Sequence, residues 1–365
     1  MKRRTAVNLA GFVLLACSLG IAQIITFEAP GSGTGSGQGT LAEGITADNT
    51  TFGYYMDSNG AAHGFIRDAH GRYETFSAPG AGTGTGQGTF AFSLNPQGAI
   101  TGYSIDSNGV SHGYVRLCRR FITFNAPGAG TGAGQGTLAL NINAHGTIAG
   151  YDFDSNGVAH AYLRDRHGRF TEWEVSGAGD QSGQGTGTAS GIGLSDDETV
   201  TGAWIDSNNT LHGYERTSDG TITPFDAPGA GTGPGQGTDT DGLNPHGTIP
   251  GVYVDSNTVI HGFVRAADGD FTTFDVSGAG TSAGQGTIPE GLNFEGAITG
   301  GYVDSNGVSH GFVRAVDGAI AKFNAPGAGK NAGQGTFPLL NNSAGAVTGY
   351  EIDGSGVYHG FLKTH

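Results

Sequence analysis

Short stretches of alternating apolar and polar residues, separated by turn residues, run along most of the chain. Four of them follow one another in one region: Thr137–Gly146, Thr147–Asp154, Val158–Arg164 and Arg169–Val175. Alternation with a period of two is typical of β-strands that bury one face. The connectors Asn-x-x-Gly, Asp-Ser-Asn-Gly and His-Gly supply the side chains and glycines that tight hairpin turns require. The pattern therefore predicts four antiparallel strands.

This group of strands recurs along the chain, marked by a Gly-Gln-Gly-Thr tetrad and by a His-Gly dipeptide that is once His-Ala. The tetrad glutamines are Gln38, Gln87, Gln135, Gln184, Gln236, Gln285 and Gln334. The repeated histidines are His63, His112, His160, His212, His261, His310 and His359. Both series advance by 49 residues, apart from one step of 48 and one of 52. A repeat of about this size with four strands is typical of one β-propeller blade.

The two ends of the chain indicate how the repeats are joined. The last repeat stops after its third strand, at His359–His365, and the missing fourth strand stands alone at Ile24–Pro30. A ring closes when the first strand of a chain completes the last blade, which leaves no open sheet edge. We expect an all-β fold, a single seven-bladed propeller of four-stranded blades over residues 23–365. An open β-solenoid is the alternative, although it would gain nothing from this offset.

The same connectivity predicts how each blade is oriented. The N-terminal strand that closes the ring should be the outermost of its blade, so the strand after each Gly-Gln-Gly-Thr tetrad should lie nearest the axis. The glycine-rich loops and the Asp-Ser-Asn turns then lie on one face of the ring. The Asn-x-x-Gly turns lie on the other face.

Residues 1–22 have the features of a secretory signal. Lys2, Arg3 and Arg4 precede a short apolar stretch, and Gly20-Ile21-Ala22 fits cleavage before Gln23. The run Leu14-Leu15-Ala16-Cys17 also resembles a lipobox, in which Cys17 would be lipidated and would tether the protein to a membrane. We therefore expect an exported protein, secreted to the extracellular space or periplasm, or lipid-anchored to the cell envelope.

Charge and cysteine content limit the possible partners. The chain has 17 basic and 32 acidic residues, a net charge of −15. Such a chain repels nucleic acid and anionic lipid, so we expect no nucleic-acid partner and membrane contact only through a lipid anchor. Cys17 and Cys118 are the only cysteines, which excludes a disulfide framework. We expect a monomer stabilised by packing.

Two stretches, "ITGYSIDSNGVSHGYVR" at Ile100–Arg116 and "ITGGYVDSNGVSHGFVR" at Ile298–Arg314, resemble the HAF repeats of bacterial extracellular proteins. The resemblance extends over essentially all of residues 23–365. It implies export and a propeller-like fold. It implies no established activity and supplies no catalytic residues.

For the repeated polar residues, a structural role is the first interpretation to consider. A histidine in each blade is expected to form hydrogen bonds between strands, since neighbouring copies are too far apart to share a metal ion. The aspartates of the Asp-Ser-Asn turns are expected to cap their own backbone. Calcium is an alternative at Asp152, Asp154 and Asn156, where "DFDSNG" matches the first half of an EF-hand loop, although Leu163 replaces the expected glutamate. No other cofactor is expected.

The basic residue that closes each third strand, such as Arg67 or Arg164, is expected to pair with a nearby aspartate in solvent.

Aromatic residues recur just before the Asp-Ser-Asn turns. They are Tyr55, Tyr103, Tyr151, Trp204, Tyr253, Tyr302 and Tyr350. Packing between blades is one interpretation, and stacking on sugars is the other. Several weak sites on one chain would gain affinity by avidity. We therefore expect a non-catalytic binding scaffold for an extracellular glycan or protein, with a calcium-stabilised adhesin as an alternative.

The repeat of 52 residues is the place to look for an enzyme, because a catalytic site needs different residues from different blades. It and its surroundings contain Glu172, Glu174, Asp196 and Asp197, together with both tryptophans of the chain. Carboxylates beside an aromatic ring are used in glycoside hydrolysis. A polysaccharide lyase or glycosidase using these four acids is thus a second alternative. The repeat of 48 residues contains "RLCRRF" (Arg116–Phe121), which predicts a shortened hairpin.

Overall fold

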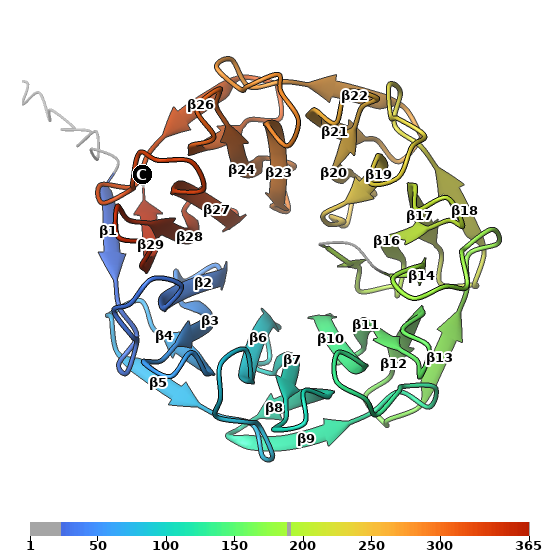
Figure 1. Ribbon diagram of the computed structural model, residues 1–365, viewed down its shortest axis with the longest axis horizontal. Helices are drawn as coiled ribbons and strands as arrows, with labels where there is room; N and C mark the ends of the chain where they lie inside the picture. The colour runs from blue at the N-terminus through green and yellow to red at the C-terminus, as the bar shows by residue number, and fades with distance from the viewer. Residues whose placement is uncertain (1–22, 188–190, 365) are drawn as a thin grey trace, which may run out of the picture.

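The computed structural model describes residues 23–187 and 191–364, and in these residues the regular elements are β-strands. The 29 strands form one continuous sheet that closes into a ring (Figure 1). The fold is therefore all-β and propeller-like, as the alternating pattern predicts. The expected signal, residues 1–22 with Cys17, lies outside the described residues. The described part of the chain has no helix of the length and apolarity needed to cross a membrane.

Each repeat folds as a group of antiparallel strands. In one of them β10 (Gly136–Ile142) pairs with β11 (Ile148–Phe153), β11 with β12 (Ala159–Arg164), and β12 with β13 (Phe170–Trp173). Each predicted stretch overlaps one of these strands, although the stretch Thr137–Gly146 also includes the turn that follows β10. Their buried and exposed residues alternate because successive side chains of a strand point to opposite faces of the sheet.

The position of a strand in its group sets its distance from the ring axis (Figure 1). The innermost strands are β2 (Gly39–Ile45), β6 (Gly88–Leu94), β10, β14 (Gly185–Thr186) with β15 (Gly193–Leu194), β19 (Gly237–Thr240), β23 (Gly286–Leu292) and β27 (Gly335–Asn341). The second strands are β3 (Thr51–Met56), β7 (Ile100–Ile105), β11, β16 (Val200–Ile205), β20 (Ile249–Val254), β24 (Ile298–Val303) and β28 (Val347–Ile352).

The remaining strands lie farther out. The third strands are β4 (Ala62–Arg67), β8 (Ser111–Leu117), β12, β17 (Leu211–Arg216), β21 (Ile260–Arg265), β25 (Ser309–Arg314) and β29 (Tyr358–Thr364). The outermost strands are β1 (Gln23–Phe27), β5 (Tyr73–Phe76), β9 (Arg120–Phe124), β13, β18 (Ile222–Phe225), β22 (Phe271–Phe274) and β26 (Ile320–Phe323). In the 52-residue repeat the innermost position is occupied by two short strands, β14 and β15.

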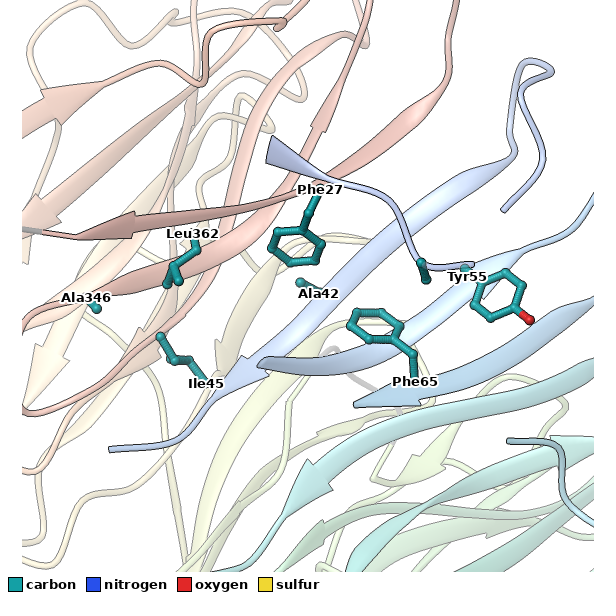
Figure 2. Packing of buried hydrophobic residues seen from close by; sticks show 8 residues of the cluster. Phe27, Ala42, Ile45, Tyr55, Phe65, Ala346 and Leu362 are labelled. Atoms are coloured by element: carbon teal, nitrogen blue, oxygen red, sulfur yellow. The ribbon is translucent and has the colours of Figure 1, made fainter. Parts of the chain in front are cut away.

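The ring is closed by the two ends of the chain, as predicted. Strand β1 pairs antiparallel with β29, in a register that sets Gln23 opposite Thr364 and Phe27 opposite Gly360. Figure 2 shows the apolar cluster at this closure, where Phe27 and Leu362 pack with residues from the first repeat. The rings of Phe27 and Phe65 meet edge to face, with centroids 6.3 Å apart. The open-solenoid alternative is therefore wrong.

The glycine-rich loops are held to their own repeat by the tetrad glutamine and to the preceding repeat by a backbone hydrogen bond. The Gln135 side-chain oxygen accepts the N–H of Gly132 at 2.7 Å, and its nitrogen donates to the carbonyl of Ser155 at 3.0 Å. The N–H of Gly134 donates to the carbonyl of Gly109, in the Asp-Ser-Asn turn of the preceding repeat, at 2.9 Å. The predicted placement of these loops and turns on one face is thus confirmed.

The tetrad threonine fixes the end of each loop from inside the protein. Thr137 is fully buried, and its hydroxyl oxygen accepts the N–H of Ala126 at 2.8 Å. The same bond is made by Thr40, Thr89, Thr186, Thr238, Thr287 and Thr336.

Thr137→Val should lower the free energy of unfolding by about 1–3 kcal/mol, because it keeps the side-chain shape but leaves a buried N–H without an acceptor. Chemical denaturation measures the loss. Thr137→Ser, which retains the hydroxyl, is the control and should cost clearly less. Equal losses for the two variants would contradict the role of this hydrogen bond.

The basic residues that close the third strands do not pair with a nearby aspartate in solvent, so that prediction is wrong. Arg116 and Arg265 form salt bridges instead with Glu74 and Glu215 of the preceding repeat. Arg164 is buried with its guanidinium over the ring of Phe124, 4.4 Å from the centroid, and Arg216 lies 4.7 Å over Trp173. The aspartate after Arg164 pairs instead with a local arginine, since Asp165 lies 2.6 Å from Arg169. These residues therefore join neighbouring repeats by cation–π contacts.

Candidate functional site

A set of three polar side chains recurs in the repeats, on the face of the ring where the Asp-Ser-Asn turns lie. In the first repeat, Nδ1 of His63 lies 2.9 Å from the hydroxyl of Ser77, and Nε2 lies 3.4 Å from Asp57. The histidine comes from the third strand, the aspartate from the turn, and the third residue follows the outermost strand. We call this set the histidine triplet. The expected hydrogen bonding of the histidines between strands is confirmed.

The triplet is present in every repeat, with a variable third member. The other triplets are His112 with Asp106 and Asn125, His160 with Asp154 and Glu174, His212 with Asp206 and Asp226, His261 with Asp255 and Asp275, His310 with Asp304 and Asn324, and His359 with Asp353 and Glu28.

Local structure keeps the turn aspartate of each triplet ionised and leaves the histidine partly exposed. One carboxylate oxygen of Asp57 accepts the N–H groups of Asn59 and Ala61, at 2.8 and 2.9 Å. Burial raises the pKa of Asp57, but these hydrogen bonds and His63 outweigh it, so the pKa lies below its usual value. The histidine side chains keep between 20 and 32% of their surface exposed. Each triplet thus offers oriented donors and acceptors to solvent.

Glutamate as the third member changes the charge of the histidine. Burial lowers the pKa of His160, but its hydrogen bond with Glu174 and the charge of that glutamate raise the pKa overall. His359 with Glu28 behaves in the same way. These two histidines are therefore protonated up to a higher pH than an ordinary histidine.

Four of the predicted aromatic residues stack directly on a triplet histidine. The ring centroids of Tyr55 and His63 are 5.1 Å apart, and those of Trp204 and His212 are 4.3 Å apart. Tyr253 and Tyr302 stack in the same manner on their histidines. Each of these aromatic residues pairs with the histidine across two neighbouring strands.

The other three predicted aromatic residues belong to a different position, which corrects the sequence analysis. Tyr103, Tyr151 and Tyr350 lie one residue earlier in their strands, so they point to the opposite face of the sheet. Tyr103 stacks on Phe90 with centroids 5.2 Å apart, and Tyr350 on Phe337 at 5.0 Å. Burial raises the pKa of Tyr151 to about 12. Tyr103 and Tyr350 thus pack on the innermost strand of their own repeat. Tyr151 lies against Gly187 of the next repeat, so the predicted packing between repeats is found for Tyr151.

Spacing from the histidine was the signal that separates the two groups. Tyr55 precedes His63 by eight residues, whereas Tyr103 precedes His112 by nine. In the repeats without a stacked aromatic ring, the position opposite the histidine holds Ser104, Asp152 or Glu351.

Two cavities open at histidine triplets. One of about 540 Å³ is lined by Asp304, His310 and Asn324 together with the glycine-rich loop at 325–330. A second, also of about 540 Å³, is lined by Asp154, His160 and Glu174 together with Asp152, Glu172 and Trp173. Cavities of this size suit small ligands or single sugar units.

The four acids of the enzyme alternative are not brought together. Glu172 and Glu174 lie in the cavity beside His160, whereas Asp196 accepts the N–H of Ala144 at the far end of β11, 2.9 Å away. Asp197 accepts a hydrogen bond from Ser195 in the same turn. The third acid in the cavity of Glu172 and Glu174 is Asp152. Its carboxylate is fully buried without a hydrogen-bond partner. Burial raises the pKa of Asp152 to about 7, although the charge of His160 opposes the rise.

The residues of the calcium alternative are engaged in the turn. The carboxylate of Asp154 accepts the N–H groups of Asn156 and Val158, at 2.8 and 2.9 Å, and the side-chain amide of Asn156 at 3.1 Å. The described residues include no group of three or more His, Cys, Asp or Glu placed to hold a metal ion. The turn-capping interpretation accounts for Asp154 and Asn156.

The sequence analysis did not identify a set of acidic residues on or next to the innermost strands. Glu43 belongs to β2 and Glu290 to β23, two of the innermost strands, and Asp241 directly follows β19, a third one. Burial raises the pKa of Glu43 to about 7. Burial and the charges of Glu43 and Asp239 raise the pKa of Glu290 to about 8. Alignment of the tetrads would have found these residues, because the same position holds Phe92, Leu140 or Leu339 in other repeats.

No family model matches the sequence, and no curated protein matches it. Among solved structures, the chain is similar to the BP39L lectin from Burkholderia pseudomallei, with a TM-score of 0.58 and 11% identity over 88% of this chain and 94% of the lectin. It is also similar to a puromycin hydrolase, with a TM-score of 0.52 and 13% identity over 88% of this chain. This chain spans about half, 51%, of the hydrolase. These similarities concern the fold.

Proposed function

We propose that this protein is a non-catalytic binding scaffold in which each repeat presents one histidine triplet to a glycan. The observation that carries the proposal is the recurrence of the triplet, with the same three structural positions, in every repeat. A catalytic group has no reason to be copied around a ring, whereas a weak binding site does, because several such sites on one chain gain affinity by avidity.

The chemistry of the triplet suits sugar hydroxyl groups. A carboxylate accepts hydrogen bonds, while an imidazole either donates or accepts, so neighbouring hydroxyls of one sugar can be bound together. In four repeats an aromatic ring stacked on the histidine holds the imidazole in place. The variable third member, from serine to glutamate, would give the repeats different preferences. A lectin among proteins of similar fold supports this choice of ligand.

We extend the proposal to the architecture and location that the sequence predicts. The ring is proposed to consist of seven blades of four strands, built from HAF-like repeats and exported as residues 23–365 or as a lipoprotein anchored at Cys17. Seven copies of the tetrad and of the repeated histidine support the blade number.

A panel of immobilised glycans and soluble polysaccharides tests the function, with binding and product release read together. We expect binding to at least one glycan without release of product. A variant with alanine at all seven triplet histidines should lose that binding. Alanine at His70 and His167, which lie outside the triplets, is the matched control and should bind like the parent protein.

Two results would overturn the proposal. Binding that survives the sevenfold histidine variant would place the ligand elsewhere on the molecule. Release of shortened product, lost on replacing Asp152 or Glu174, would show a glycoside hydrolase at that one cavity.

A further inference from the structure

A third cavity lies at the opposite end of the repeats, away from the histidine triplets. It has a volume of about 580 Å³ and lies between the repeat of β6–β9 and the repeat of β10–β13. Its apolar lining consists of Val115, Leu117, Phe121, Ile122 and Ile142. Leu117 and Ile122 remain 47 and 56% exposed, so the apolar lining continues to the surface of the protein.

The apolar character is specific to this pair of repeats. One repeat farther along, a cavity of about 390 Å³ occupies the same place, with Asp165 and Thr171 at the positions of Leu117 and Ile122. The remaining repeats carry at these two positions Asp68 and Glu74, Thr217 and Thr223, Ala266 and Thr272, Ala315 and Ala321, and Thr364 and Ile25. Only the β8–β9 repeat has a large apolar residue at both.

The shortened hairpin predicted for the 48-residue repeat builds this lining. Leu117 pairs with Arg120 across a turn of two residues, Cys118 and Arg119, which both have positive φ, 48° and 65°. The tight turn extends β8 and β9 by one pair, which carries Leu117 on the strand into the cavity wall. The shortened hairpin of this repeat thus creates an apolar cavity wall that has no part in glycan binding at the triplets.

The charge of the cavity is opposite to that of the protein. Arg120, Arg164 and Arg166 line it, and none of its described lining residues is acidic, in a chain with 32 acidic and 17 basic residues. Two acids adjoin the cavity and are both engaged: Asp165 pairs with Arg169, and Asp196 accepts the N–H of Ala144, which is a lining residue. The Nε of Arg164 is buried without a hydrogen-bond partner.

We propose that this cavity binds a small organic anion with an apolar body, such as a medium-chain carboxylate. The apolar chain would lie against Leu117, Phe121 and Ile122, and the carboxylate would face Arg120 and Arg166. Burial of methylene groups supplies the affinity, and the arginines select the anion over neutral molecules of the same size. The proposal is independent of glycan binding, because the two sites lie at opposite ends of the repeats.

Calorimetric titration of the full chain with decanoate, below its micelle concentration, tests the proposal. We expect one decanoate per chain, with affinity rising about threefold to fourfold for each added methylene. Leu117→Asp with Ile122→Thr should weaken binding at least tenfold. The fold tolerates these residues in the next repeat, and circular dichroism checks the folding of the variant. Val316→Asp, at an exposed valine outside the cavity, is the control and should bind like the parent protein.

A variant that removes the charges tests the role of the arginines separately from that of the apolar residues. Arg120→Gln with Arg166→Ser should weaken decanoate binding several-fold and reduce its dependence on salt. Decan-1-ol should bind the parent protein more weakly than decanoate does. The proposal is wrong if decanoate does not bind, if decan-1-ol binds equally well, or if the Leu117/Ile122 variant, once shown to be folded, binds undiminished.

Discussion

Gly136→Ala is expected to destabilise the protein by about 3–5 kcal/mol, the largest effect of any single methyl group that we predict. Gly136 has a φ of 108°, which side chains other than glycine rarely adopt. A Cβ atom there would lie 2.1 Å from the carbonyl oxygen of Ser111, in the preceding repeat. That oxygen belongs to a strand that pairs with Gly136, so neither backbone can move without breaking the contact between repeats.

Gly134→Ala, two residues earlier, separates the two causes of this loss. Gly134 also has a positive φ, 77°, but a Cβ atom there would meet nothing within 4 Å. It should cost only about 1 kcal/mol, from backbone strain alone. Urea denaturation of both variants measures the difference. Equal losses would show that close approach of the repeats does not limit this position.

Glu290→Gln is expected to stabilise the protein by up to about 5 kcal/mol at pH 9 and to have no effect at pH 4. Burial, with the charges of Glu43 and Asp239, raises the pKa of Glu290 from 4.5 to about 8. Between these two values the folded protein holds a proton that the unfolded chain releases. The stability contributed by this group therefore falls as the pH rises from about 4.5 to about 8, and glutamine removes that loss.

Denaturation midpoints of parent and variant across this pH range test the prediction. The exposed Glu295, on the turn after β23, provides the control, and Glu295→Gln should leave the stability unchanged at both pH values. A Glu290→Gln variant that is no more stable than the parent at pH 9 would show that burial and the neighbouring acids do not raise the pKa of Glu290.

The architecture was predictable because it depends on spacing along the chain. The regular tetrads and the fourth strand displaced to Ile24–Pro30 were enough to predict a closed ring and the pairing of β1 with β29. The turn aspartates and the tetrad glutamines were also predictable, since their partners lie within the same loop or the next turn.

Contacts between repeats were not predictable in the same way. Arg164 stacks on Phe124, 40 residues earlier in the sequence, while an aspartate stands directly beside it and suggested an ion pair. The charge of Glu43 raises the pKa of Glu290, and the charge of Glu290 raises the pKa of Asp241, although these residues are far apart in the chain. All three stand on or directly after innermost strands.

Only part of the candidate site could be predicted from the sequence. The repeated histidines were recognised, but their third partners follow the outermost strand, and the partner of His359 is Glu28 at the other end of the chain. The aromatic residues were grouped by their nearness to the Asp-Ser-Asn turn. A shift of one residue moves a side chain to the other face of a strand, so this grouping joined Tyr55 with Tyr103 although they have different roles.

The number of sugar units bound per chain is the most direct test of the central claim, that each repeat presents a binding site. Native mass spectrometry with the strongest ligand of the glycan panel would count them. We predict several bound units on one chain, with one unit lost for each triplet histidine replaced by alanine. A single bound unit, or a number that does not change when the histidines are replaced, would contradict the account.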